Sequence, residues 1–268
     1  MSTTPDYFDA NQKSWNKATA YHVASDFYDV PAFLNGKNSL NSIELNLLGD
    51  ITGQSLLHLQ CHFGQDTLSL ARMGANTTGI DLSDAAIQQA QALAAQLALD
   101  KKAAFMCSNV YNLKENLQGQ FDIVFSSYGV IGWLPDMNKW AQIVSHFLKP
   151  GGQFIFVEFH PAVWMFDNDF TNLQYSYFNV EVIKEESSGS YADKNADFKQ
   201  LTYNWNHSLA DVITALLQAG LKLEQFQEFD YSPYNCFRNT IQEGNRYYIK
   251  GMEHKLPMVY ALKMSKPI

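Results

Sequence analysis

Short apolar runs alternate with amphipathic segments along most of the chain. Runs bounded by polar or glycine-containing turns lie at 56–59, 77–81, 103–109, 121–127 and 153–159, and two more lie at 221–229 and 257–264. Runs that are apolar throughout are typical of strands buried on both faces of a sheet. The pattern therefore predicts seven strands.

Helical segments with recognisable start and stop signals separate these strands. Asp136 is placed to cap a helix that ends at the proline- and glycine-containing turn 149–152. Ser208 and Asp211 form a capping-box pattern for a later helix, which Gly220 ends. Strands that alternate with helices indicate crossover connections. We predict an α/β fold with a seven-stranded, mostly parallel, doubly wound sheet.

The alternation stops after Pro161. Two strand-like runs, 175–184 and 200–205, flank the turn-rich stretch 185–197. This pattern predicts a β-hairpin inserted after the fifth strand. We expect residues 161–206 to form a lid on a core that spans 51–268.

The first fifty residues are rich in aromatic side chains and less regular. Helical spacing of apolar residues is visible at 9–20 and 39–48. We predict that residues 1–50 form a helical, aromatic cap, which either covers one face of the core or also closes over a ligand.

Composition narrows the class of protein. Hydrophobic residues make up 46% of the 268 residues and charged residues 17%, which favours a globular chain with a large core. The net charge is −8 and there are only three arginines, so we expect neither nucleic acid nor a membrane surface as a partner. Three widely spaced cysteines and the lack of an apolar run near ~18 residues indicate a cytoplasmic protein without disulfides or membrane spans.

The stretch 55–83 reads as strand, turn, helix and second strand, and the second strand ends on Asp81. Parallel sheets bind ligands beyond the carboxyl ends of their strands, where the strand order reverses. A carboxylate at the end of the second strand can accept hydrogen bonds from the hydroxyls of a ribose. This βαβ unit is therefore the predicted binding site for a nucleotide-like ligand.

Several motifs together resemble the class I S-adenosylmethionine-dependent methyltransferases. They are LLHLQCHFG at the first strand, GIDLS at the second, FDIVFSSYGV at the fourth and LKPGGQFIFVEF at the fifth, and the likeness spans about 55–262. The HLQCHFG wording is similar to a bacterial subgroup of small-molecule methyltransferases. The resemblance implies a Rossmann-like methyltransferase fold, S-adenosyl-L-methionine as cofactor, and in-line methyl transfer to a small-molecule acceptor.

The turn after the first strand departs from the family's D-x-G-x-G-x-G pattern. His58, Gln60 and His62 occupy the first three fixed positions, and only Gly64 retains its glycine. By resemblance, Asp81 binds the ribose, and Asn109 reads the adenine amino group through its amide oxygen. The full set of expected cofactor-binding residues is Gln60, Cys61, His62, Gly64, Asp81, Leu82, Asn109, Val110, Ser126 and Ser127.

Candidate catalytic and substrate residues lie at strand ends and in the insertion. His160 and His207 are candidate bases, with a structural histidine as the alternative, and Tyr128 follows the fourth strand. The substrate walls are predicted to include Trp133, Trp164 and Trp205, which would otherwise belong to the core of the lid.

Other chemistries remain open at this point. The i, i+4 spacing of His58 and His62 is that of a zinc site on a helix, but here it falls on a strand and a turn, so we expect no metal. No base accompanies Cys61, which argues against a nucleophilic thiol. The alternatives are a non-catalytic protein that binds S-adenosylmethionine or another nucleoside, and an NAD(P)-linked oxidoreductase, although the G-x-G-x-x-G turn of the latter is absent.

Overall fold

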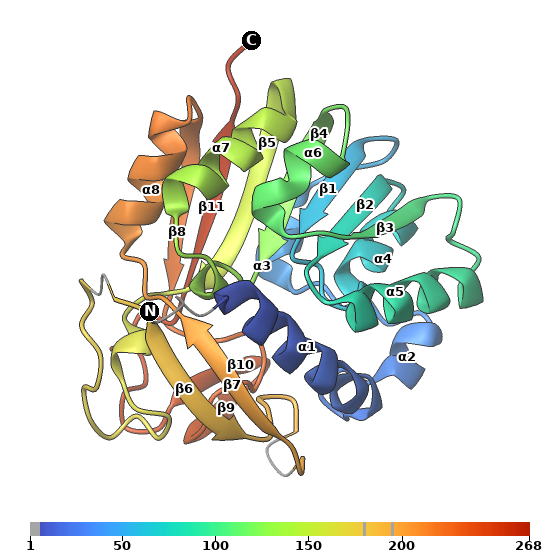
Figure 1. Ribbon diagram of the computed structural model, residues 1–268. Coiled ribbons are helices and arrows are strands. Elements are labelled where there is room, and N and C mark those ends of the chain that lie inside the picture. Colours follow the sequence, from blue (N-terminus) through green and yellow to red (C-terminus); the bar gives the residue numbers. More distant parts are fainter. Residues whose placement is uncertain (1–5, 179–180, 194–195) are drawn as a thin grey trace, which may run out of the picture.

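A computed structural model describes residues 6–178, 181–193 and 196–268. Its centre is a seven-stranded sheet with the order β3-β2-β1-β4-β5-β11-β8 (Figure 1). The strands are β1 (Ser55–Leu59), β2 (Asn76–Asp81), β3 (Ala103–Cys107), β4 (Phe121–Ser127), β5 (Leu148–Phe159), β8 (Lys222–Phe229) and β11 (Val259–Ser265). β11 alone runs in the direction opposite to the other six strands of this sheet. The predicted α/β fold is confirmed.

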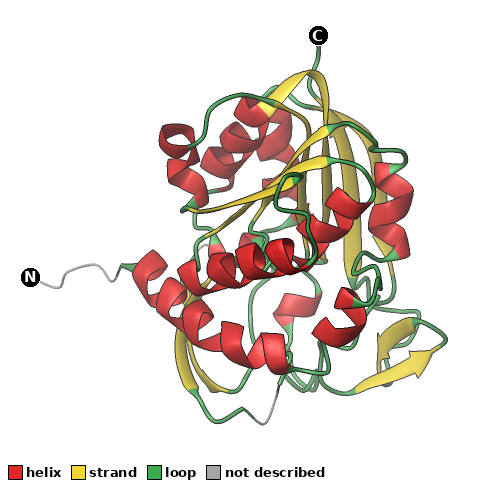
Figure 2. Ribbon diagram, turned by 90° about the vertical axis from the view of Figure 1, so that its right-hand side faces the viewer, coloured by secondary structure: helices red, strands yellow, loops and turns green. Residues whose placement is uncertain are grey.

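Helices cover both faces of the sheet (Figure 2). The α-helices of the described chain are α1 (Tyr7–Ala24), α2 (Val30–Leu34), α3 (Ser42–Leu48), α4 (Gln65–Arg72), α5 (Asp84–Gln96), α6 (Leu113–Asn116), α7 (Met137–Phe147) and α8 (Leu209–Gln218). The Asp136 side chain accepts the N–H of Lys139, and Ser208 and Asp211 form the expected capping box. Local sequence signals therefore begin these helices where the side chains satisfy free backbone N–H groups.

Alternate residues of β5 supply the cores on the two faces. Phe154 and Phe156 pack against α7, whereas Ile155 and Val157 pack in a second cluster that includes α3. All four side chains are fully buried. A strand apolar at every position is required because both of its faces are covered.

The Lys-Pro-Gly-Gly turn lies inside β5, where the pairing with β4 shifts register. Gly151 has a φ of 77°, and a Cβ on Gly152 would lie 2.9 Å from the carbonyl oxygen of Lys149. Lys149 pairs with Asp122 at 2.8 Å. The glycines are thus needed for the conformation and the close approach at this bulge.

The inserted hairpin is present, but its first strand was predicted at the wrong place. The strands are β6 (Ile183–Ser188) and β7 (Lys199–Asn204), so β6 occupies part of the stretch predicted to be turns. Residues 179–180, inside the predicted run 175–184, lie outside the described residues. β6 is mostly polar because it belongs to an exposed two-stranded sheet, and such a strand lacks the apolar alternation that a sequence pattern can detect.

A second hairpin, β9 (Thr240–Glu243) and β10 (Arg246–Ile249), was not predicted. No helix within the described ranges combines the length and apolar character needed to cross a membrane.

Helix α1 lies along β7 (Figure 1). The side chain of Asn11 exchanges two hydrogen bonds with the backbone of Tyr203, both 2.9 Å long. Ser14 donates to the carbonyl of Leu201 at 2.8 Å. The helix and the inserted hairpin therefore form one continuous unit beside the carboxyl ends of the strands.

Candidate functional site

A cavity of about 1020 Å³ lies at the carboxyl ends of β1, β2 and β4. The strand order reverses at β1, whose neighbours are β2 on one side and β4 on the other. Helices diverge at such a reversal and leave a crevice above the sheet. Helix α1, the inserted hairpin and the loop between β8 and β9 complete the wall, so the cavity lies between the core and its cover.

The turn after β1 keeps a left-handed backbone at alternate positions. The φ angles of Gln60, His62 and Gly64 are 57°, 51° and 83°. These are the three positions that hold glycines in the resembled pattern. A non-glycine residue in this conformation costs about 1–2 kcal/mol. The backbone shape of a glycine turn is therefore preserved here at an energetic cost.

Packing explains why position 64 requires a glycine. A Cβ on Gly64 would lie 2.7 Å from the ring of Phe105 and 2.9 Å from Ala90. The other two side chains have room and partners: Gln60 Nε2 donates to the carbonyl of Val130 at 2.7 Å, and His62 lies against α1. Their contacts can offset part of the cost of the left-handed conformation.

Asp81 holds this turn against the end of β2. One carboxylate oxygen accepts the backbone N–H of His62 at 2.7 Å and the other accepts the N–H of Ser83 at 2.9 Å. Burial raises the pKa of Asp81 to about 6, although these hydrogen bonds oppose the rise. Each oxygen keeps a second lone pair, so the carboxylate can still accept hydrogen bonds from a ligand in the cavity.

His62 also connects the turn to the cap and the lid. Its Nε2 hydrogen-bonds Nδ1 of His22 on α1 at 2.8 Å, and the other nitrogen of His22 meets the hydroxyl of Ser190 at 3.0 Å. Trp15 packs edge-on against the His62 ring. Burial lowers the pKa of His22 to about 4, so both rings are neutral at pH 7 and one donates to the other.

The adenine-side candidates line the cavity as a group. Leu82, Asn109 and Val110 are all in its wall. The amide oxygen of Asn109 already accepts the N–H of Tyr111 at 2.9 Å and caps a 3₁₀ turn, Val110–Asn112. Its side-chain N–H₂ group is therefore the more available half toward a ligand.

The two serines at the end of β4 have different surroundings. Ser127 lines the cavity, but Ser126 is fully buried and its hydroxyl donates to the carbonyl of Leu59 at 3.4 Å. Side chains alternate between the faces of a strand, so only one of two neighbours can face the cavity.

His58 and Cys61 are both buried. His58 is 2% exposed, its Nδ1 meets the Thr67 hydroxyl at 2.8 Å, and burial lowers its pKa to about 3. Burial raises the pKa of Cys61, which disfavours the thiolate. Within the described ranges, no group of three or more His, Cys, Asp or Glu residues is arranged to hold a metal ion.

The three catalytic candidates have different surroundings. His160 is outside the cavity wall: its Nε2 meets Glu228 at 2.9 Å and its Nδ1 accepts the N–H of Ala162. His207 lines the cavity, and its Nε2 donates to the carbonyl of Leu134 at 2.7 Å. Tyr128 also lines it, but its hydroxyl is buried. Of the two histidines, the structure therefore brings only His207 to the site.

The three predicted tryptophans all line the cavity, in two places. Trp133 lies edge-on to Trp15 of α1, with 5.3 Å between ring centroids, and Trp205 packs beside Tyr7 of the same helix. Trp164 instead packs on Phe159, at the end of β5. Aromatic rings therefore form walls on both the cap side and the insertion side.

Three carboxyl groups near the cavity were not among the predicted site residues. Glu158 lines the wall and organises the loop after β4, because its two oxygens accept backbone N–H bonds from Gly129, Val130 and Ile131. Asp66, on the first turn of α4, also lines the wall, and burial raises its pKa. Glu44 of α3 is 1% exposed. Two of them had a sequence signal: Glu158 ends the fifth predicted strand, and Asp66 directly follows the family turn.

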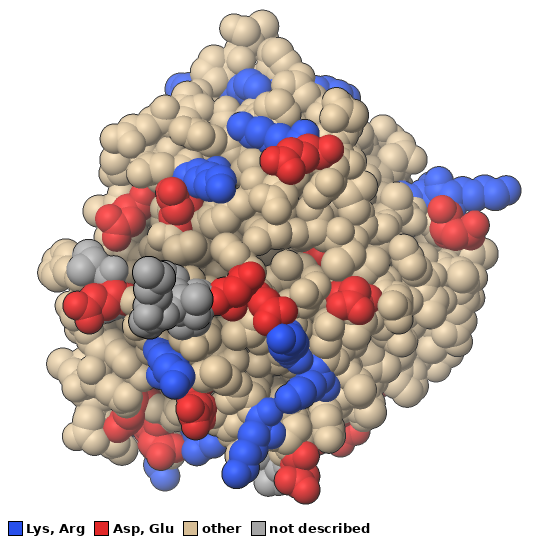
Figure 3. Space-filling model, viewed as in Figure 1, with Lys and Arg blue, Asp and Glu red and all other residues tan. Residues whose placement is uncertain are grey.

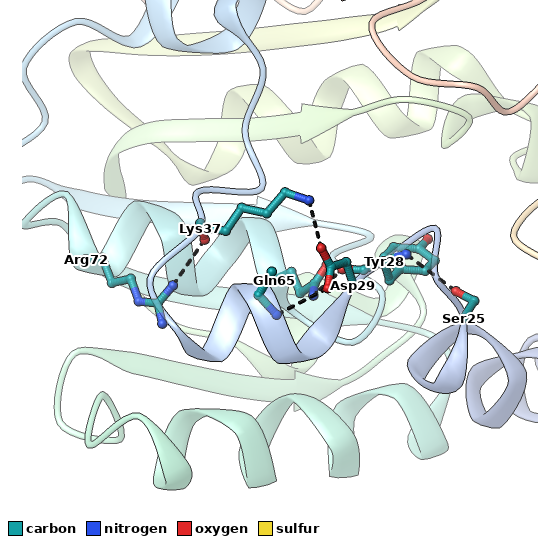
Figure 4. A network of polar contacts seen from close by, with 7 residues as sticks. Ser25, Tyr28, Asp29, Lys37, Gln65 and Arg72 are labelled. Atoms are coloured by element: carbon teal, nitrogen blue, oxygen red, sulfur yellow. Dashed lines mark hydrogen bonds and ion pairs between the residues drawn. The ribbon is translucent and has the colours of Figure 1, made fainter.

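Polar contacts tie the segment between α1 and α3 to α4 (Figure 4). Gln65 donates to the carbonyl of Tyr28 at 3.0 Å, and Arg72 donates to the carbonyl of Phe33 at 2.9 Å. Lys37 pairs with Asp29. These contacts hold Tyr28 in the cavity wall, where its hydroxyl meets that of Tyr191 from the inserted hairpin.

Comparison with known proteins agrees with this geometry. Residues 56–152 match the family model of a methyltransferase domain. An uncharacterized methyltransferase of Synechocystis sp. is 31% identical over 138 residues, which are 50% of this chain and 60% of that protein. The chain spans between 54% and 66% of the length of the curated relatives it matches.

Solved structures share the fold over nearly the whole chain. An S-adenosylmethionine-dependent methyltransferase of Clostridium acetobutylicum aligns over 96% of this chain and 99% of its own, with a TM-score of 0.58 and 18% identity. The cyclase SpnF aligns over 100% and 98%, also with a TM-score of 0.58, at 14% identity. The predicted Rossmann-like methyltransferase fold is confirmed, and a protein named for a different reaction shares it.

Proposed function

We propose that this chain, whose residues 56–152 form a class I methyltransferase domain, transfers a methyl group from S-adenosylmethionine to a small-molecule acceptor. One observation carries the proposal: the turn Gln60–Gly64 keeps the left-handed backbone of a glycine turn and is hydrogen-bonded to Asp81 at the end of β2. A strained backbone maintained beside a buried carboxylate is typical of a ligand site rather than of a core contact.

The described residues fit the cofactor. Asp81 would hold the ribose hydroxyls, and Leu82, Asn109 and Val110 would surround the adenine. The side-chain oxygen of Gln60 is buried and has no hydrogen-bond partner among the described residues, so a donor on the ligand would satisfy it. When bound, the cofactor supplies a methyl group already activated on a sulfonium.

The chain's own contribution is alignment and the exclusion of water. Helix α1 and the hairpin β6–β7 cover the cavity, and His22 and Ser190 connect both of them to the turn. Positioning of two reactants can lower a barrier by about 7–11 kcal/mol. The enclosed cavity supports a small acceptor, because an extended polymer requires an open groove.

A general base is needed only where the methyl acceptor carries a proton that it must lose. His207 fits this role best among the candidates. Its Nε2 donates to a backbone carbonyl, which leaves Nδ1 as the basic nitrogen, and burial lowers its pKa so that the ring is neutral at pH 7. Tyr128 shapes the wall in this proposal, and His160 supports the end of β5 from outside the cavity.

Other features support the proposed setting. Basic and acidic side chains lie close together over the face seen in Figure 3, without the broad basic surface that nucleic acid requires. Cys61, Cys107 and Cys236 form no disulfide in the described part of the chain, which favours a reducing compartment such as the cytoplasm.

A methyl-transfer assay distinguishes an enzyme from a protein that only binds the cofactor. The purified chain would be incubated with methyl-labelled S-adenosylmethionine and an extract of small metabolites. We expect label in a small molecule, and loss of most of it in Asp81→Ala. If S-adenosylhomocysteine binds the chain but no extract accepts label, the non-catalytic alternative is correct.

A further inference from the structure

The resembled turn carries a carboxylate at the position of His58, and this chain does not. His58 cannot replace it, because its ring is buried between Thr67, which it hydrogen-bonds at 2.8 Å, and Phe125, which it meets edge-on. The ring is also neutral at pH 7, since burial lowers its pKa to about 3. The ammonium group of an amino-acid ligand would therefore lack a charged partner at this position.

A carboxylate is available at the other end of the same turn. Asp66 lies on the first turn of α4 and lines the cavity together with Gln60 and Ser127. Burial raises the pKa of Asp66, and hydrogen bonding from the hydroxyls of Ser39 and Ser127 opposes this rise. Neutral hydroxyls do not cancel its charge.

No described cation neutralises Asp66. The basic residues in the cavity wall have other partners: Lys37 pairs with Asp29, Lys184 with Glu186 and Arg238 with Asp169. A partly buried carboxylate without a cation is costly unless a bound ligand supplies the opposite charge. Asp66 is thus placed to receive a cationic group.

Gln60 provides a second, independent acceptor. Its Nε2 is fixed by the carbonyl of Val130 at 2.7 Å, which orients the amide. Its Oε1 is then buried without a hydrogen-bond partner in the part of the chain that the structure describes. An unsatisfied buried acceptor in the turn and an uncompensated carboxylate at the start of the following helix together fit a group that has several N–H donors and a positive charge.

We propose that Asp66 and the side-chain oxygen of Gln60 bind the ammonium group of the cofactor's amino-acid portion, replacing the carboxylate that is missing at position 58. This inference rests on the proposed function. The neighbouring Gln65 anchors the start of α4 to the carbonyl of Tyr28 at 3.0 Å (Figure 4).

A cycle of two ligands and two proteins tests the pairing. The ligands are S-adenosylhomocysteine and its deaminated analogue, which keeps the adenosine, the thioether and the carboxylate but lacks the ammonium group. The proteins are the wild type and Asp66→Asn. A charge-assisted hydrogen bond is worth about 10- to 100-fold in affinity, so the wild type should prefer S-adenosylhomocysteine by that factor.

The Asp66→Asn variant should lose this preference and bind the deaminated analogue as the wild type does. Asp84→Asn is the matched control, because it removes an exposed carboxylate from the first turn of α5, outside the cavity wall. This control should keep the full preference. Calorimetry measures all the affinities, and thermal unfolding checks that each variant is folded.

The possible outcomes separate a failure of the inference from a failure of the proposed function. A variant that binds both ligands more weakly by the same factor would make Asp66 a structural residue and overturn the inference. So would a wild type that binds both ligands equally, a result that does not depend on the variant folding. If the wild type binds neither ligand, the proposed function itself fails and the inference fails with it.

Discussion

Glu44 offers a quantitative test of the electrostatics beside the cavity. It is the third residue of α3 and 1% exposed, and its Oε1 accepts a hydrogen bond from Asn41 at 3.2 Å. Its Oε2 and the hydroxyl of Tyr128 are both buried without a hydrogen bond of normal geometry to any described residue. Burial, and to a lesser extent Asp66, raises the pKa of Glu44 from 4.5 to about 7.

The size of the effect follows from this change in pKa. At 1.36 kcal/mol per pKa unit, the rise from 4.5 to about 7 corresponds to about 3 kcal/mol. Below pH 4.5 the group is neutral in both the folded and unfolded states. Between pH 4.5 and 7 the unfolded chain releases this proton while the folded protein retains it, so the stability is lost progressively over that range and is fully lost above pH 7. Glu44→Gln mimics the neutral form and avoids the loss.

Urea unfolding at pH 5 and pH 8 measures the difference between the two proteins. We expect a difference of less than about 1 kcal/mol at pH 5, which lies just above the unfolded pKa, and a variant more stable by about 3 kcal/mol at pH 8. Other titrating groups act equally in both proteins and cancel. The control Glu115→Gln, which changes an exposed carboxylate, should show no such dependence on pH. A difference that is the same at both pH values would refute the reasoning.

Three further predictions concern the turn, the cap and the sheet. Gly64→Ala should destabilise the fold by about 2–4 kcal/mol, because φ is 83° and the new Cβ would meet Phe105 at 2.7 Å. A free energy of unfolding within about 0.5 kcal/mol of the wild type, measured by thermal unfolding, would contradict this. His22→Ala should release α1 from the turn and speed dissociation of S-adenosylhomocysteine by about 3- to 10-fold in stopped-flow measurements, since one buried hydrogen-bonded link is lost; an unchanged rate would mean that the link does not retain the ligand. His160→Ala should cost about 1–3 kcal/mol of stability yet leave the methyl-transfer rate within about threefold, because both ring nitrogens are used outside the cavity; a large loss of rate in a folded variant would restore His160 as a catalytic candidate.

The central strands of the sheet were predictable because they are buried on both faces. A run such as 121–127 is apolar at nearly every inner position, and this pattern needs no knowledge of its neighbours. β6 is the opposite case. It is polar and exposed, and its position is set by its pairing with β7, where Ile183 is opposite Asn204. Register between two polar strands leaves little pattern in either of them.

The site was predictable only where residues follow the family's motifs. Asp81 and the turn 60–64 lie at strand ends, which parallel topology brings together. Glu44, by contrast, approaches Tyr128 only through the packing of α3 on the sheet. Ser126 and His160 had the right positions in the sequence, but their side chains point away from the cavity. The pleat of the strands and the tertiary packing determine which way these side chains point, and neither can be inferred from a single sequence.

Titration of the wild-type chain with S-adenosylhomocysteine, and separately with NADH, tests the central claim most directly. A turn that keeps its left-handed backbone beside Asp81 should bind S-adenosylhomocysteine at sub-millimolar concentration and give no comparable heat with NADH. An absence of binding to S-adenosylhomocysteine, or a clear preference for NADH, would contradict the proposed cofactor and with it the proposed methyl transfer.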